Sequence, residues 1–204
     1  MIRVTLVRPS LDRLDGYLDA LRRGWLPDTV GGEAAAREQR TWIARDAAGF
    51  LASLDDEEAR SGPIRLPDGS LVPRLPGMQR WIWDGAFCGR IGLRWQPGST
   101  ALPPHVLGHV GYAVVPWKRG RGYARAALAL ILPEAQARGL THVELTTEPD
   151  NLASRRVIEA CGGRLVEKST SSSERSGKPT SIPASWVLPM TFGRSLSARV
   201  YFQS

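Results

Sequence analysis

The segment VVPWKRGRGYA at residues 114–124 constrains the fold of this chain more than any other feature. A β-branched run ends at Pro116, a turn contains Gly120 and Gly122, and an alanine-rich run typical of a helix follows at once. This order places free backbone amides at the start of a helix, where the helix dipole favours an anion and glycines let it approach. The segment therefore predicts a phosphate-binding loop; the alternative is an ordinary glycine turn before a core helix.

Two common phosphate-binding families do not fit this loop. It lacks the Lys-Ser/Thr ending of a P-loop and the GxGxxG spacing of a dinucleotide-binding fold. Arg119 and Arg121 add positive charge beside the glycines. A different phosphate-binding fold is therefore needed.

The elements predicted around the loop follow the order strand, two helices, three strands, helix, strand, helix, two strands. Apolar periodicity and turn residues place helices at 10–25, 33–59, 123–138 and 151–162, and strands at 2–8, 80–95 (a hairpin around Asp84-Gly85), 109–115, 141–147, 164–169 and 185–190. Pro133 predicts a kink or an earlier end in the third helix. The proline- and glycine-rich segments 60–80 and 96–107 predict loops, and loops of this length often line sites.

The composition is that of a globular protein of one ordinary domain, with 204 residues, 42% hydrophobic and 23% charged. The longest apolar run, at 126–132, is far shorter than the ~20 residues that span a bilayer, and the start of the chain lacks a signal-peptide pattern. We therefore expect a cytoplasmic protein with no membrane partner. Cys88 and Cys161 are too few for a disulfide framework, so we expect buried free thiols, and we expect no metal site.

The formal charge of +7 suits an anionic partner such as a nucleotide cofactor, an acidic protein or RNA. Because no long basic run occurs, the charge favours a solvated surface over nucleic-acid binding.

Two motifs identify the family that this sequence resembles. Arg119-x-x-Gly122-x-Ala124, between a predicted strand and a predicted helix, resembles the Arg/Gln-x-x-Gly-x-Gly/Ala signature of the GNAT acetyltransferase superfamily. Downstream, EPDNLASRRVIEACGG at 148–163 is similar to the family's Asn-containing strand-to-helix segment. The resemblance covers residues 80–169 closely, and within the superfamily the chain is most similar to the bacterial predicted acetyltransferases, which share a GHxGYxxxP strand and an Asn-x-x-Ser helix start.

The resemblance implies a fold, a reaction and a cofactor. It implies an α/β fold (an α+β mixed sheet flanked by helices) forming one domain over 1–190, with a tail at 191–204 of no assignable role. It implies an N-acetyltransferase that moves an acetyl group from acetyl-CoA to a primary amine of a small molecule or peptide. The cofactor-binding residues it implies are Ala113, Val114 and Val115, whose backbone would pair with the pantetheine arm, the loop Arg119, Gly120, Arg121, Gly122, Tyr123 and Ala124 at the pyrophosphate, and Asn151 and Ser154 on the next helix.

The catalytic groups are less constrained by the sequence. His109 begins the cofactor strand where some relatives place a general base, and a histidine with a pKa of about 6.5 suits that role. The alternatives are a structural histidine bonded to the backbone, and Glu144 as the base. Ile158 aligns with the tyrosine that often protonates the departing thiolate in the family, so the general acid is missing and water is a substitute. Tyr112 is expected on the strand face opposite His109.

Two other functions stay open. The missing tyrosine is consistent with a noncatalytic acyl-CoA sensor, and the positive charge with an acetyltransferase acting on an RNA-associated substrate. The sequence does not choose between a monomer and a homodimer. The acceptor is expected to depend on the amino-terminal helices and on the loops at 60–80 and 96–107. These segments hold Trp25, Trp42, His105 and the acidic run from Asp55 to Glu58, to which the sequence assigns no role.

Overall fold

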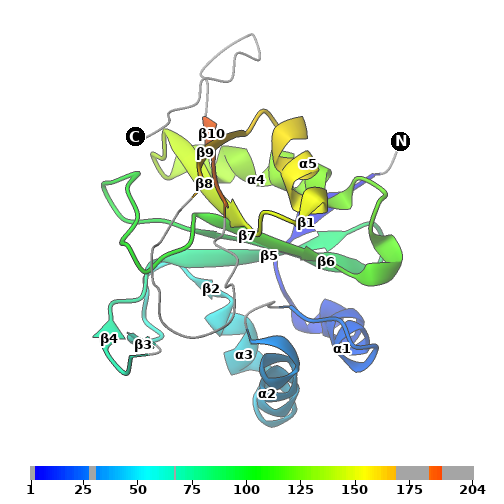
Figure 1. Ribbon diagram of the computed structural model, residues 1–204. Coiled ribbons are helices and arrows are strands. Elements are labelled where there is room, and N and C mark those ends of the chain that lie inside the picture. Colours follow the sequence, from blue (N-terminus) through cyan, green and yellow to red (C-terminus); the bar gives the residue numbers. More distant parts are fainter. Residues whose placement is uncertain (1–2, 28–30, 67, 169–183, 190–204) are drawn as a thin grey trace, which may run out of the picture.

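The computed structural model describes residues 3–27, 31–66, 68–168 and 184–189, and these residues form two sheets flanked by helices (Figure 1). The first sheet has the strand order β1 (Thr5–Val7), β5 (Gly77–Trp83), β6 (Phe87–Arg94), β7 (Val110–Val114), with β2 (Asp55–Asp56) beside β5. The second has the order β8 (His142–Thr147), β10 (Ala184–Pro189), β9 (Arg164–Lys168). The predicted α/β class is confirmed, and the predicted hairpin around Asp84-Gly85 is the β5–β6 pair.

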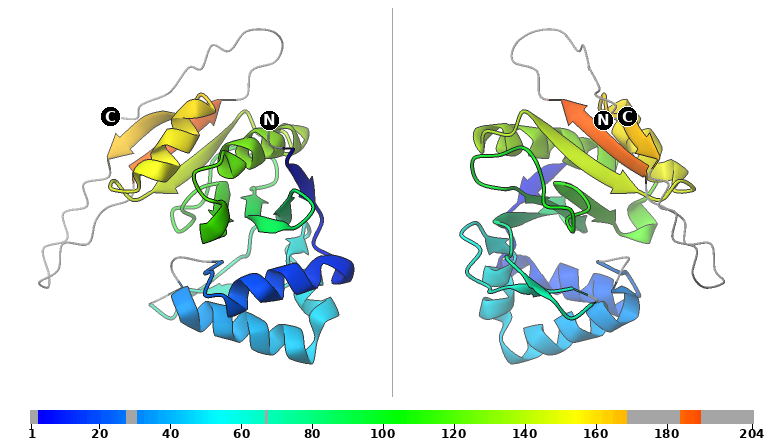
Figure 2. Two further views of the ribbon diagram at one scale, coloured as in Figure 1. Left: turned by 90° about the vertical axis from the view of Figure 1, so that its right-hand side faces the viewer. Right: turned by 60° about the vertical axis from the view of Figure 1, so that its left-hand side comes forward.

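The helices cover the first sheet from opposite sides. In Figures 1 and 2, α1 (Leu14–Arg22), α2 (Gly32–Arg45) and α3 (Ala47–Ser53) lie below it, while α4 (Tyr123–Ala137) and α5 (Leu152–Ala160) lie above it with the second sheet. Short 3-10 turns precede α1 (η1, Leu11–Arg13) and follow β7 (η2, Pro116–Lys118), and β3 (Ile64–Arg65) and β4 (Leu71–Val72) form a separate hairpin. The cofactor motifs thus lie above the sheet.

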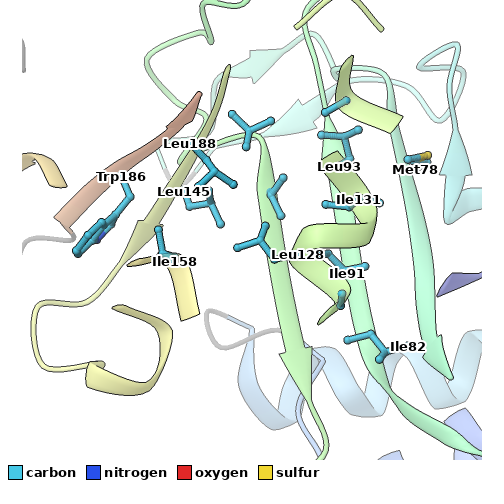
Figure 3. Packing of buried hydrophobic residues seen from close by; sticks show 14 of the residues in the cluster. Met78, Ile82, Ile91, Leu93, Leu128, Ile131, Leu145, Ile158, Trp186 and Leu188 are labelled. Carbon is cyan, nitrogen blue, oxygen red and sulfur yellow. The ribbon is translucent and has the colours of Figure 1, made fainter. Parts of the chain in front are cut away.

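Each face of the sheet buries its own hydrophobic cluster. The upper cluster packs Leu128 and Ile131 of α4 and Ile158 of α5 against β6, β7 and β8 (Figure 3). The lower cluster is aromatic: Tyr17 stacks on Trp81 with ring centroids 5.2 Å apart and meets Phe87 edge to face. These contacts fix β7 between two packed layers.

Two predicted elements differ from the structure. The single helix expected over 33–59 is two helices, because Asp46 ends α2 and its side chain caps α3 by accepting from the Gly49 amide at 2.8 Å. Asp55 lies in β2 rather than at a helix end, and there it pairs with Arg80 at 2.9 Å.

Pro133 does not end α4, which continues from Tyr123 to Ala137. The proline removes the amide bond to Ala129, and both residues are exposed, so water can satisfy that carbonyl. Cys88 and Cys161 are free thiols, as predicted, with Cys88 buried and Cys161 partly buried. The predicted tail at 191–204 lies outside the described residues.

Within the described part of the chain, no helix is both long and apolar enough to cross a membrane. The same residues contain no group of three His, Cys, Asp or Glu side chains placed to hold a metal ion.

Candidate active site

Strands β7 and β8 meet at one end and separate toward the other. At the junction, the His109 amide donates to the Glu144 carbonyl at 2.8 Å, and His109 Nδ1 accepts from the Glu144 amide at 2.9 Å. Gly108 permits this approach, since its φ is +123° and a Cβ there would lie 2.8 Å from the Glu144 oxygen. Beyond the junction the two strands belong to different sheets and diverge (Figure 3).

A cavity of about 650 Å³ occupies the opening between the strands. One wall is β7 from Val110 to Ala113, and the facing wall is β8 from Leu145 to Thr147. The cavity continues to the start of α5, where it is lined by Asn151, Ser154 and Ile158. Three residues of the predicted site, Ala113, Asn151 and Ser154, are therefore brought together on one cavity.

The start of α5 is held by local bonds. Asn151 is the N-cap, and its Oδ1 accepts from the Ser154 amide at 3.1 Å. The Tyr112 hydroxyl reaches from β7 and donates to the Ser154 carbonyl at 3.4 Å. Burial raises the pKa of Tyr112, so this hydroxyl is protonated at neutral pH. Ile158, one turn further along α5, is only 1% exposed.

The glycine loop at 119–124 leads from η2 into α4. Gly120 and Gly122 have φ of +73° and +86°, which favour glycine, and a Cβ at either position would meet nothing within 4 Å. Within the described residues, the amides from 120 to 125 have no hydrogen-bond partner. Arg119 and Arg121 are exposed, and Arg119 Nε donates to the Val114 carbonyl at 3.1 Å. The loop therefore presents open amides and positive charge at a helix start.

Of the three residues predicted to pair with the pantetheine arm, only one presents its backbone to the free edge of β7. The Val115 amide donates to Cys88 of β6 at 3.0 Å, and strand alternation turns the backbone of Ala113 to the same side. Val114 presents its backbone to the opposite edge, as does Tyr112. Val114 and Val115 do not line the cavity.

His109 and Glu144 stand outside the residues that line the cavity. The His109 side chain is fully buried, and its Nε2 is enclosed. Burial lowers the pKa of His109 to about 4. The His142 side chain, whose Nε2 lies 3.6 Å from Glu144 Oε1, lowers the pKa of Glu144.

The cavity is also lined by polar side chains, most of which the sequence does not single out; one of them, His105, comes from a loop that it does. They come from β2, the β4–β5 loop, β6, the β6–β7 loop and the residue after β8: Asp56, Arg74, Arg90, Arg94, His105 and Glu148. Only the predicted role of long loops in lining sites points to this region from the sequence.

Comparison with known proteins places this geometry in a family. A model described as an acetyltransferase (GNAT) domain matches residues 3–164. The chain belongs to the GNAT acetyltransferase family. The match spans β1 to the start of β9, so it includes the β7–β8 opening, the glycine loop and α5 of this GNAT acetyltransferase.

A mycothiol acetyltransferase from Beutenbergia cavernae is 29% identical to this GNAT chain over 136 residues. The aligned part is 66% of this chain but 43% of that relative, so the chain spans less than half of the relative's length.

Solved structures of other acetyltransferases share the fold. A spermidine N-acetyltransferase from Vibrio cholerae, in complex with CoA and spermine, has a TM-score of 0.56 at 11% identity over 91% of this chain and 95% of its own. RimJ from Mycobacterium smegmatis, in complex with CoA-disulfide, has a TM-score of 0.53 at 17% identity over 92% of this chain and 81% of its own. Because their sequence identity to this chain is low, these structures show that the fold is shared. They do not indicate which acceptor this chain uses.

Proposed function

We propose that this acetyltransferase moves an acetyl group from acetyl-CoA to a primary amine. The observation that carries the proposal is the cavity between β7 and β8, which is lined by charged and polar side chains and continues to the N-terminus of α5. An amine and a thioester could therefore meet between the two strands.

The residues at the glycine loop fit the diphosphate of CoA. The amides from Gly120 to Ala124 are open, a Cβ would find free space at both glycines, and Arg119 and Arg121 add charge. Val114 lies on the edge of β7 that an extended arm could pair with, and Asn151 and Ser154 line the far wall. Acetyl-CoA, when bound, supplies the activated acetyl thioester.

Tyr112 is the group we assign to proton donation toward the thiolate. Tyr112 lines the cavity, and its hydroxyl donates to the carbonyl of Ser154, which precedes Ile158 by one helical turn. It is protonated at neutral pH, and it approaches α5 from β7 rather than from the helix itself. It could thus supply the acid that Ile158 cannot.

The proton lost by the amine needs an acceptor on the cavity. His105 lines it, and its Nε2 is buried without a hydrogen-bond partner among the described residues, whereas both carboxylate oxygens of Asp56 already accept from backbone amides, those of Arg60 and Ser61. His109 lines no part of it, and its Nδ1 lone pair is used by the Glu144 amide. We therefore propose His105 as the base, and a structural role for His109 at the strand junction.

The test is thiol release from acetyl-CoA with a panel of primary amines. The enzyme should release CoA in an amine-dependent way, and mass spectrometry should find one added acetyl group per product. Tight CoA binding without release for any amine, including peptide amino termini, would favour the noncatalytic sensor.

A further inference from the structure

Asp84 joins the two ends of the glycine loop from a distant part of the chain. It lies in the turn between β5 and β6, and its Oδ2 accepts from Lys118 Nζ at 2.5 Å and from the Tyr123 hydroxyl at 2.5 Å. Lys118 is the last residue of η2, just before the loop, and Tyr123 is the first residue of α4, just after it. One carboxylate therefore bridges the residues on both sides of 119–122.

The side chains that form the bridge are partly enclosed. The side chains of Asp84 and Lys118 are 18% and 19% exposed, Tyr123 is buried, and Lys118 Nζ lies 5.4 Å from the centre of the Tyr123 ring. Asp84 Oδ1 also accepts from the Ala86 amide at 3.2 Å, which fixes the carboxylate on its own turn. Burial alone would raise the pKa of Asp84, but the bonds from Lys118 and Tyr123 outweigh it and hold the pKa below its usual range. Asp84 is thus charged at neutral pH.

Apart from this bridge, Arg119 anchors the start of the loop through its bond to the Val114 carbonyl. Gly120 and Gly122 are the most flexible residue type, and their surroundings are open. Ordering such a loop at the moment of binding would cost affinity, whereas a loop held beforehand avoids that cost. A fixed loop keeps its amides aimed at one point.

We propose that Asp84 is a positioning residue for acetyl-CoA, because it clamps the phosphate loop in its binding shape. The proposal rests on the proposed function, since it assumes that the loop holds the cofactor diphosphate. The clamp and a simple charge effect predict opposite changes in CoA affinity when Asp84 is removed. Asp84 carries the same charge as phosphate, so electrostatics alone would have its removal tighten CoA binding. The clamp predicts that removal of Asp84 weakens CoA binding.

Calorimetric titration of CoA into Asp84→Asn decides between the two. Asparagine keeps the size of the side chain but removes the charge that holds Lys118. We expect the Kd for CoA to rise about tenfold, while kcat at saturating acetyl-CoA stays within about twofold of the wild-type value. Tyr123→Phe, which removes one of the two bonds without changing the charge, should raise the Kd by a smaller factor.

Asp68→Asn is the matched control. Asp68 is an exposed turn aspartate that also accepts from a nearby residue, Ser70, but it lies on the β3–β4 hairpin away from the loop. Its removal changes the net charge equally and should leave the Kd unaltered. If Asp84→Asn does not fold by circular dichroism, Tyr123→Phe carries the test.

The outcomes separate this proposal from the one on which it rests. A wild-type protein that binds no CoA would refute the proposed function and the clamp together. A wild-type protein that binds CoA, with Asp84→Asn binding equally or more tightly, would overturn the clamp alone, and so would an unchanged Kd in Tyr123→Phe if Asp84→Asn is unfolded.

Discussion

At the scale of single residues, Tyr112 and His109 show what strand alternation can and cannot predict. The sequence places them on opposite faces of one strand, and in the structure Tyr112 lines the cavity while His109 does not. Which face borders the cavity depends on β8, which arrives 30 residues later by a crossover through α4. No local pattern in the strand carries that information.

Tyr112→Phe should lower kcat by about 100-fold, because the change removes the proposed proton donor and keeps the ring. The Kd for CoA should stay near its wild-type value. Steady-state kinetics and calorimetry measure the two effects, and Tyr123→Phe is the contrasting control, with its effect on Kd rather than on kcat. An unchanged kcat in Tyr112→Phe would exclude this residue as the acid.

His109 should make the fold sensitive to acid. Its pKa of about 4 in the folded protein is below the ordinary 6.5, so the unfolded chain binds the proton more readily. The contribution of neutral His109 to the free energy of unfolding is fully present above pH 6.5 and is lost as the pH falls toward 4. Glu144 opposes the shift, while His142 and Arg94 reinforce it.

Urea unfolding at pH 7 and pH 5 tests this linkage. The wild type should lose about 2 kcal/mol more than His109→Gln between the two values. Both proteins share all other titrating groups, so the difference isolates His109. Equal losses would contradict a buried neutral histidine.

At the scale of elements, the segments with strong local signals are predicted well. The Asp84-Gly85 hairpin, the glycine turn before α4 and the Asn151 helix start all appear where their turn and cap residues predict them. The break between α2 and α3 was missed, although Asp46 is a good N-cap, because the apolar spacing continues through it. The opening between β7 and β8 could not be predicted, because it is a relation between strands in two sheets.

Gly111 tests the role of that opening. It lies in β7 on the cavity, and a Cβ there would meet nothing within 4 Å. Gly111→Leu should therefore leave the free energy of unfolding nearly unchanged and lower the acetylation rate by about 100-fold or more, because the side chain fills the space where the acceptor meets the thioester.

The measurements are urea unfolding and the initial rate of thiol release. The loop at 119–124 lies outside the cavity lining, so CoA binding should be affected less than turnover. Gly111→Leu with full activity would show that the reaction takes place elsewhere.

At the scale of the whole molecule, two hydrophobic clusters hold β7 from both faces while its free edge faces the opening. The upper cluster joins α4, α5 and β8 to the sheet, and the lower aromatic cluster joins α1 and α3 to it. CoA bound at the glycine loop and α5 would therefore contact the starts of both helices that pack above the sheet, α4 and α5.

Ligand binding should accordingly raise the stability of the whole chain. At a CoA concentration 100 times its Kd, the free energy of unfolding should increase by about 2.7 kcal/mol, which corresponds to a rise in Tm of about 5–10 °C for a chain of this size. Thermal unfolding with and without CoA measures the shift. An equal shift in Gly122→Glu would show that CoA acts somewhere other than the loop.

The central claim is that the loop at 119–124 binds the diphosphate of CoA, and calorimetric titration of CoA tests it most directly. Gly122→Glu puts a carboxylate among the open amides, and Gly69→Glu is its control, with φ of +87° against +86° and equally open surroundings on the β3–β4 hairpin. We predict one CoA per chain for the wild type and for Gly69→Glu, and no measurable binding for Gly122→Glu. CoA binding by Gly122→Glu equal to that of Gly69→Glu would contradict the account.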